Sequence, residues 1–112
     1  MGKLISLIIA CLTVGAAGPA WAGSSGEGKI IRLQVRATDG LHFVVIDGPL
    51  AGRPSCATQS YYMIADEHSD AGKDQFAVLL SAYMSGRAVM IEGTGTCTRW
   101  SDGEDIMAIT LK

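Results

Sequence analysis

Two neighbouring segments of the chain alternate between apolar and polar residues. In residues 31–36 and again in residues 41–46, every second side chain is aliphatic or aromatic, which is the period of a half-buried β-strand. Asp39-Gly40 between them is a strong tight-turn signal, so the two segments are predicted to form a hairpin. The residues expected to share one face of each strand are Ile31, Leu33 and Val35 in the first and Leu41, Phe43 and Val45 in the second.

The middle of the chain predicts a less distinct strand and one helix. The third strand is expected at about residues 57–64. The helix is predicted from about Ala71 to Ser85, with Ser69 or Asp70 as its N-cap and Gly86 after its last turn. Its apolar stripe follows helical spacing and consists of Phe76, Leu79, Leu80 and Tyr83.

Two further strands complete the predicted domain. The fourth spans residues 87–92 with Val89 and Ile91 facing one way, and the fifth spans residues 105–111. The fifth strand is expected to turn Met107, Ile109 and Leu111 inward. The resulting order, β-β-β-α-β-β, predicts an all-β fold with one helix, a five-stranded OB-fold-like barrel. The alternative is an α+β sheet with one helix packed across it.

The first 22 residues carry the three parts of a secretory signal. Lys3 is followed by an apolar run over residues 4–14, and Ala20-Trp21-Ala22 supplies small residues at a cleavage site. There are two alternatives to a cleaved signal. The first is a membrane anchor, which needs about 20 apolar residues, and this run is shorter. The second is a lipoprotein cleavage site at Cys11. We expect cleavage after Ala22, a flexible polar leader over residues 23–28, a domain over residues 29–112, and a periplasmic or secreted location.

Charge and cysteine content narrow the partners and the compartment. A chain that begins at Gly23 loses Lys3, which leaves eight Lys and Arg residues against eleven Asp and Glu residues. This acidic balance argues against nucleic-acid binding. Cys56 and Cys97 are then the remaining cysteines, and an exported domain of this size predicts a disulfide between them, two free buried thiols being the alternative. No second apolar run is long enough to span a membrane.

One stretch of the sequence resembles a family of bacterial toxin subunits. Residues 76–97, FAVLLSAYMSGRAVMIEGTGTC, are similar to the helix and following strand of the B subunits of subtilase-cytotoxin-like and pertussis-like AB5 toxins. The hairpin over residues 30–48, followed by Cys56, is similar as well. The resemblance implies an OB-fold, and it suggests a pentameric homo-oligomer and glycan binding. The chain is shorter than those subunits, and none of their sugar-contacting residues is carried over to it.

The sequence contains no arrangement typical of catalysis. His42 and His68 are the only histidines; His42 is expected to face solvent, and His68 lies in the acidic loop over residues 66–70. Neither that loop nor the acidic run over residues 102–105 has metal-ligand spacing, and no serine has an assignable base. We therefore predict a protein that is not an enzyme and has no cofactor and no metal site.

The most informative candidate residue is Trp100, which lies in a polar loop three residues after Cys97. An aromatic ring beside Arg99 and Asp102 can stack on a sugar while the polar groups bind its hydroxyls. Because adjacent strand residues point to opposite faces, one of Tyr61 and Tyr62 is expected to join them. The predicted ligand-binding residues are Trp100, Arg99, Asp102, Tyr61 and Tyr62. The alternative is that Trp100 packs over the disulfide or closes the barrel end.

Three functions follow from these observations. The first is an exported, non-enzymatic binding module for glycans or for a protein partner. The second is an envelope structural or interaction protein whose barrel surface serves only as an interface. The third is a small hydrolase or a hydrolase inhibitor.

Overall fold

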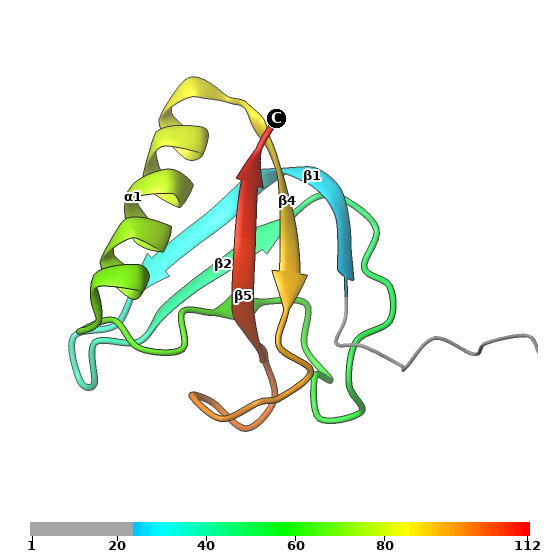
Figure 1. Cartoon of the computed structure of the whole chain (residues 1–112), viewed down its shortest axis with the longest axis vertical. Coiled ribbons are helices and arrows are strands. Elements are labelled where there is room, and N and C mark those ends of the chain that lie inside the picture. The colour runs from blue at the N-terminus through cyan, green and yellow to red at the C-terminus, as the bar shows by residue number, and fades with distance from the viewer. Residues whose placement is uncertain (1–23) are drawn as a thin grey trace, which may run out of the picture.

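The structure, a computed structural model, describes residues 24–112 (Figure 1). The predicted signal sequence and its cleavage site lie outside the described residues. The elements are β1 (Ser24–Val35), β2 (His42–Ile46), β3 (Tyr62–Met63), α1 (Asp70–Ser85), β4 (Ala88–Gly93) and β5 (Glu104–Leu111). The predicted order β-β-β-α-β-β is therefore confirmed.

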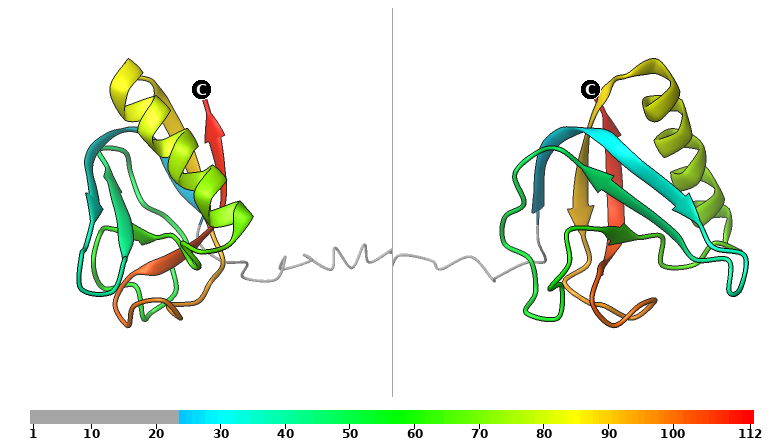
Figure 2. Two further views of the ribbon diagram at one scale, coloured as in Figure 1. Left: turned by 90° about the vertical axis from the view of Figure 1, so that its left-hand side faces the viewer. Right: turned by 180° about the vertical axis from the view of Figure 1, so that it is seen from behind.

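The five strands close into a barrel. Each strand pairs with two others in the order β1-β2-β3-β5-β4, and β4 pairs again with β1. All of these pairs are antiparallel except β3 with β5, which is parallel. The predicted OB-fold-like barrel is confirmed, and the alternative of an open α+β sheet is wrong, because the sheet closes on itself. The helix α1 packs along one side of this barrel, against β1, β4 and β5 (Figure 2).

The first strand closes the barrel because it is long enough to serve two neighbours. Its first part, from Ser24 to Lys29, pairs with β4, and its second part pairs with β2. The sequence places ordered structure from Lys29 onward, whereas β1 already begins at Ser24. Close contact between backbones accompanies this path: a Cβ atom on Gly28 would lie 2.4 Å from the backbone nitrogen of Gly48.

Irregular pairing at two positions changes which apolar residues face inward. In β1 the pairing passes from Ile30 directly to Arg32, and in β5 it passes from Ile106 to Ala108. The extra residues are Ile31 and Met107, both of them exposed. A β-bulge adds one residue to one strand and reverses the alternation beyond it. The core therefore takes Ile30 and Ile106. The predicted inward position of Met107 is wrong, and so is the prediction that Ile31 shares a face with Leu33.

The remaining predictions of which strand residues face the core are only partly correct. Leu33 and Ile109 pack against the core as expected, but Val35 and Leu111, near the ends of their strands, are exposed. In β2, Phe43 and Val45 share a face as predicted, and the barrel interior takes the opposite face, with Val44 and Ile46.

Because Met107 lies at a bulge and faces solvent, its mutation is expected to have only a small effect on stability. Met107 is 57% exposed, so Met107→Ala is expected to change the free energy of unfolding by less than about 0.5 kcal/mol, as at other surface positions. A buried methionine would lose about 2–5 kcal/mol on the same substitution. Urea denaturation measures the difference, and a loss of about 2 kcal/mol or more would place Met107 in the core.

The third strand is much shorter than predicted. Only Tyr62 and Met63 form ladder pairs, whereas the sequence suggests residues 57–64. The backbone preceding them bonds elsewhere: the Thr58 N–H donates to Cys56, and the Gln59 N–H donates across to the carbonyl of Asp102. These bonds replace a strand with a turn-rich loop.

The helix is capped as predicted, but the side that it turns towards the core differs in part from the predicted apolar stripe. The Ser69 hydroxyl accepts a hydrogen bond from the Gly72 N–H, and Gly86 adopts a left-handed conformation after the last turn. Leu79 is buried and Phe76 packs against the core, as expected, but Leu80 and Tyr83 are exposed because small Ala82 takes the remaining core position. The buried core consists of Ile30, Val44, Ile46, Tyr62, Ile64, Leu79, Ala82, Val89, Ile91 and Ile106.

Candidate functional site

The candidate site is built by two loops on the same side of the barrel. The β1–β2 loop covers residues 36–41, and the β4–β5 loop covers residues 94–103. The second loop ends in a tight turn in which Trp100 pairs with Gly103. In OB-folds, the face of the second and third strands, together with the β1–β2 and β4–β5 loops, is the usual surface for binding oligonucleotides and oligosaccharides.

Trp100 lies against Arg36, the first residue of the β1–β2 loop. The Arg36 guanidinium carbon lies 4.3 Å from the centroid of the Trp100 ring, and the indole is still 39% exposed. The Tyr61 hydroxyl donates a hydrogen bond to Asp102, two residues beyond Trp100. The Tyr61 ring also packs against Phe43, with centroids 5.2 Å apart. We call this set, Arg36, Phe43, Tyr61, Trp100 and Asp102, the Trp100 surface.

The environment of Tyr61 keeps its hydroxyl protonated. Burial, followed by the hydrogen bond to Asp102 and the charge of that carboxylate, raises the pKa of Tyr61 to about 12. The phenol is therefore a hydrogen-bond donor at every physiological pH. It donates to Oδ1 of Asp102, and within residues 24–112 the other oxygen, Oδ2, accepts no hydrogen bond.

Ultraviolet titration of tyrosinate absorbance tests this arrangement. A folded-state pKa above the ordinary value near 10 stabilises the fold below about pH 10, and this contribution is lost as the pH rises towards 12. Tyr61→Phe should remove a late-titrating component, and Asp102→Asn should move it to lower pH without fully restoring the ordinary value, because burial persists. If the component that Tyr61→Phe removes from the wild-type curve titrates near pH 10, the ordinary value for tyrosine, that result would contradict the hydrogen bond.

Of the two adjacent tyrosines, the structure places Tyr61 on the surface and Tyr62 in the core. Tyr62 is fully buried, with its ring under the Arg53 guanidinium at 4.5 Å. Arg53 is itself nearly buried, 3.7 Å from the Glu104 carboxylate, and donates to the backbone carbonyls of Gln59 and Tyr61. Tyr62 therefore cannot contact a surface ligand, and Arg53 fixes the segment that carries Tyr61.

Arg99 points to charged neighbours and not across the Trp100 ring. Its guanidinium binds the Glu67 carboxylate, with Nη2 2.5 Å and Nε 2.9 Å from Oε1, and Nη2 also donates to the Asp39 carbonyl at 2.8 Å. Asp39 in turn accepts two hydrogen bonds from Arg36, at 2.9 and 2.6 Å. These four residues form a charge chain, Arg36–Asp39–Arg99–Glu67, which links the β1–β2 loop, the loop before α1 and the β4–β5 loop.

The ionisation of the charge chain follows from its hydrogen bonds. The bond from Arg36 holds the pKa of Asp39 well below its ordinary value, and the bond from Arg99 lowers the pKa of Glu67. The same contacts raise the pKa of both arginines. All four groups are therefore charged at neutral pH, and each arginine of the chain is neutralised by a carboxylate.

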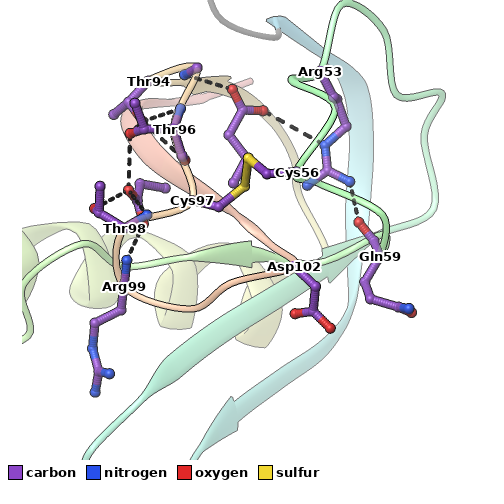
Figure 3. The surroundings of a disulfide bond; sticks show 12 residues. Arg53, Cys56, Gln59, Thr94, Thr96, Cys97, Thr98, Arg99 and Asp102 are labelled. Carbon is purple, nitrogen blue, oxygen red and sulfur yellow. Dashed lines mark hydrogen bonds and ion pairs between the residues drawn. A yellow bond between two sulfur atoms is a disulfide. The ribbon is translucent and has the colours of Figure 1, made fainter.

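A buried carboxylate and a disulfide hold the β4–β5 loop beneath the site. Asp105 accepts hydrogen bonds from the backbone N–H groups of Thr98 and Arg99, at 2.9 and 3.1 Å, and from the Thr96 hydroxyl at 3.2 Å. The predicted disulfide between Cys56 and Cys97 is confirmed. Figure 3 shows it lying between Arg53 on one side and the threonines of the β4–β5 loop on the other.

His42 is placed differently from the prediction. It is half-buried, and its ring meets the edge of Phe76 with centroids 4.8 Å apart, while Nδ1 lies 2.5 Å from the Gly40 carbonyl. His68 is exposed in the loop before α1. Within residues 24–112, His, Cys, Asp and Glu side chains form no cluster suited to a metal ion. None of the helices in that range has the length and apolarity to cross a bilayer.

Sequence reasoning missed Arg36, Phe43, Asp39 and Glu67. Arg36 and Asp39 flank the predicted hairpin turn with the spacing of a local ion pair, which is a usable signal. Nothing in the sequence connects Phe43 with Tyr61, or Glu67 with Arg99, because these pairs come from different elements and meet only in the closed barrel.

Comparison with known proteins gives no match: no protein-family model, no curated protein and no solved structure is similar to this chain at a significant level. The geometry of the Trp100 surface is therefore the basis on which a function can be assigned.

Proposed function

We propose that this protein is an exported, non-enzymatic carbohydrate-binding module that uses the Trp100 surface. The observation that carries the proposal is the half-exposed indole of Trp100 on the β4–β5 loop, beside the Tyr61 ring and the Asp102 carboxylate. An aromatic ring offers an apolar surface for a sugar ring, and a carboxylate accepts hydrogen bonds from hydroxyls. The location supports the proposal, since OB-folds bind oligosaccharides on this face.

The construction of the site further supports binding. The charge chain fixes Arg36 against one face of the indole, while Asp105 and the disulfide fix the loop that carries Trp100. Side chains held in place before binding lose less conformational entropy when a ligand arrives. Arg99, expected from the sequence to contact the ligand, is in this proposal a positioning residue, because Glu67 and Asp39 occupy its guanidinium.

Export is part of the same proposal. The disulfide is compatible with an oxidising compartment, and the expected signal over residues 1–22 would direct the chain there. N-terminal sequencing of extracytoplasmic protein tests it: we expect Gly23 first, whereas an intact Met1 or a lipid-modified Cys11 would contradict it. A toxin-like pentamer remains an expectation of the resemblance, and solution mass measurement would test it.

Trp100→Ala is expected to abolish most binding with little loss of stability. We expect affinity for a bound glycan to fall by at least about 30-fold, which corresponds to the roughly 2 kcal/mol of a binding hot spot. The free energy of unfolding should fall by about 1 kcal/mol, less than the ~3–5 kcal/mol of a fully buried aromatic residue. A glycan array identifies a bound glycan, and calorimetry then compares the variants.

The matched control is Tyr83→Ala, which removes an exposed aromatic side chain from α1 and should leave binding unchanged. Retained affinity in Trp100→Ala would overturn the proposed site. An array on which no glycan binds would overturn the proposed function and favour an envelope structural or interaction protein.

A further inference from the structure

The positive charges around Trp100 are each paired with a carboxylate, but one negative charge is not paired with a cation. The arginines nearest the indole, Arg36 and Arg99, are each bound by a carboxylate, Asp39 and Glu67 respectively. Asp102 is different. Among residues 24–112 no Lys, Arg or His lies within ion-pair distance of its side chain, which receives its hydrogen bond from the neutral Tyr61 hydroxyl.

The Trp100 surface and the charge chain together hold two arginines and three carboxylates, so their excess charge is one negative unit. The next cation inward, Arg53, does not change this balance, because it is nearly buried and lies 3.7 Å from the Glu104 carboxylate. An anionic ligand placed on the indole would approach Asp102, while Arg36, Arg99 and Arg53 are already bound by carboxylates. Two like charges a few ångströms apart at a protein surface repel each other more strongly than in bulk water, because the local dielectric constant is lower.

Resting on the proposed function, we infer that the site selects neutral saccharides and rejects those carrying a carboxylate or a sulfate. Asp102 supplies the selection in both directions. Its free oxygen accepts a hydrogen bond from a sugar hydroxyl, and a hydroxyl bound to a carboxylate forms a short, charge-assisted bond. The same negative charge, uncompensated by Arg36 or Arg99, opposes an acidic sugar. Asp102 is therefore the specificity-determining residue of the site.

Paired glycans on one array test this inference: neutral oligosaccharides, and the same oligosaccharides capped with sialic acid or bearing sulfate. We expect the neutral member of each bound pair to bind at least about tenfold more tightly at low salt. The preference should shrink as ionic strength rises from about 0.02 to 0.5 M, because salt screens the repulsion. Asp102→Asn keeps an acceptor oxygen but removes the charge, so it should bring the two members of a pair within about threefold of each other.

The control variant Asp74→Asn removes one negative charge from an exposed position on α1 and should leave the preference unchanged. The two proposals fail in different ways. If glycans bind and Trp100→Ala abolishes binding, but acidic members of the pairs bind equally or more tightly, the site stands and the inference is overturned. The same holds if Asp102→Asn and Asp74→Asn have equal effects. If no glycan binds, both proposals are overturned.

Discussion

Replacing both cysteines by serine is expected to lower the free energy of unfolding by about 2–5 kcal/mol, the usual cost of losing a native disulfide from a small domain. The bond between Cys56 and Cys97 joins positions 41 residues apart. In the chain-entropy description, a cross-link over a loop of this length stabilises by roughly 4 kcal/mol, because it restricts the unfolded chain. A domain this small has only a modest core to offset the loss.

Chemical denaturation of the Cys56→Ser, Cys97→Ser double variant measures this effect. Wild-type protein unfolded in excess reductant is the control, and it should match the double variant. Ligand binding should weaken by more than the fraction unfolded explains, because the disulfide anchors the loop that carries Trp100. Equal stability with and without the bond would show that the barrel alone holds together the two loops that carry Cys56 and Cys97. Alkylation without reduction, followed by mass measurement, tests whether the bond forms in the exported protein.

Asp105→Ala is expected to cost about 2–4 kcal/mol and to displace the β4–β5 loop. The Asp105 carboxylate is 1% exposed and accepts bonds from two backbone N–H groups and two threonine hydroxyls of that loop. Hydrogen bonds to a charged group contribute about 1.5–3 kcal/mol, and buried donors left without a partner are costly. Asp105→Asn should lose less, since it keeps one acceptor oxygen while turning an amide N–H₂ towards the other donors.

Fluorescence separates loop displacement from general unfolding. A chain that begins at Gly23 has Trp100 as its sole tryptophan, so the emission spectrum reports on that loop. Under native conditions Asp105→Ala should shift the emission to longer wavelength and weaken glycan binding, although Asp105 is too deeply buried to contact a ligand. Asp74→Ala, which removes an exposed carboxylate from α1, is the control and should change neither. An unshifted spectrum with a loss below about 0.5 kcal/mol would show that Asp105 does not hold the loop.

The cysteine double variant and Asp105→Ala each remove a contact that holds the Trp100 surface in place from beneath. From the inside outward, the supports are Asp105 and the disulfide under the β4–β5 loop, then the charge chain between the loops. Arg36 connects this support to the site, because it belongs to the charge chain and also stacks on the indole. Loops held on a stable scaffold are frequent sites of function.

The order of the elements, the helix caps and the disulfide could all be predicted from the sequence. The strands and the caps depend on residues close together in sequence, and the disulfide depends on the number of cysteines. Alternation identifies a strand, and a hydroxyl before an apolar stripe identifies a helix start. The two cysteines that the predicted cleavage would leave have one possible pairing. The fold class followed, because few architectures accept five strands with a helix between the third and fourth.

The residues that face inward, and those that meet in the site, depend on how the strands pair in the closed barrel. Bulges at Ile31 and Met107 reverse the alternation, and their positions depend on strand pairing, which the chain does not show locally. The sequence likewise does not distinguish Tyr61 from Tyr62, because only the position of β3 in the barrel buries one of them. The neighbours of Arg99 in sequence predict contact with a ligand, whereas its partner in the fold, Glu67, lies 32 residues away. Ion pairs and aromatic contacts between distant segments form only when the barrel closes, and it is those contacts that give the Trp100 surface its charge and its shape.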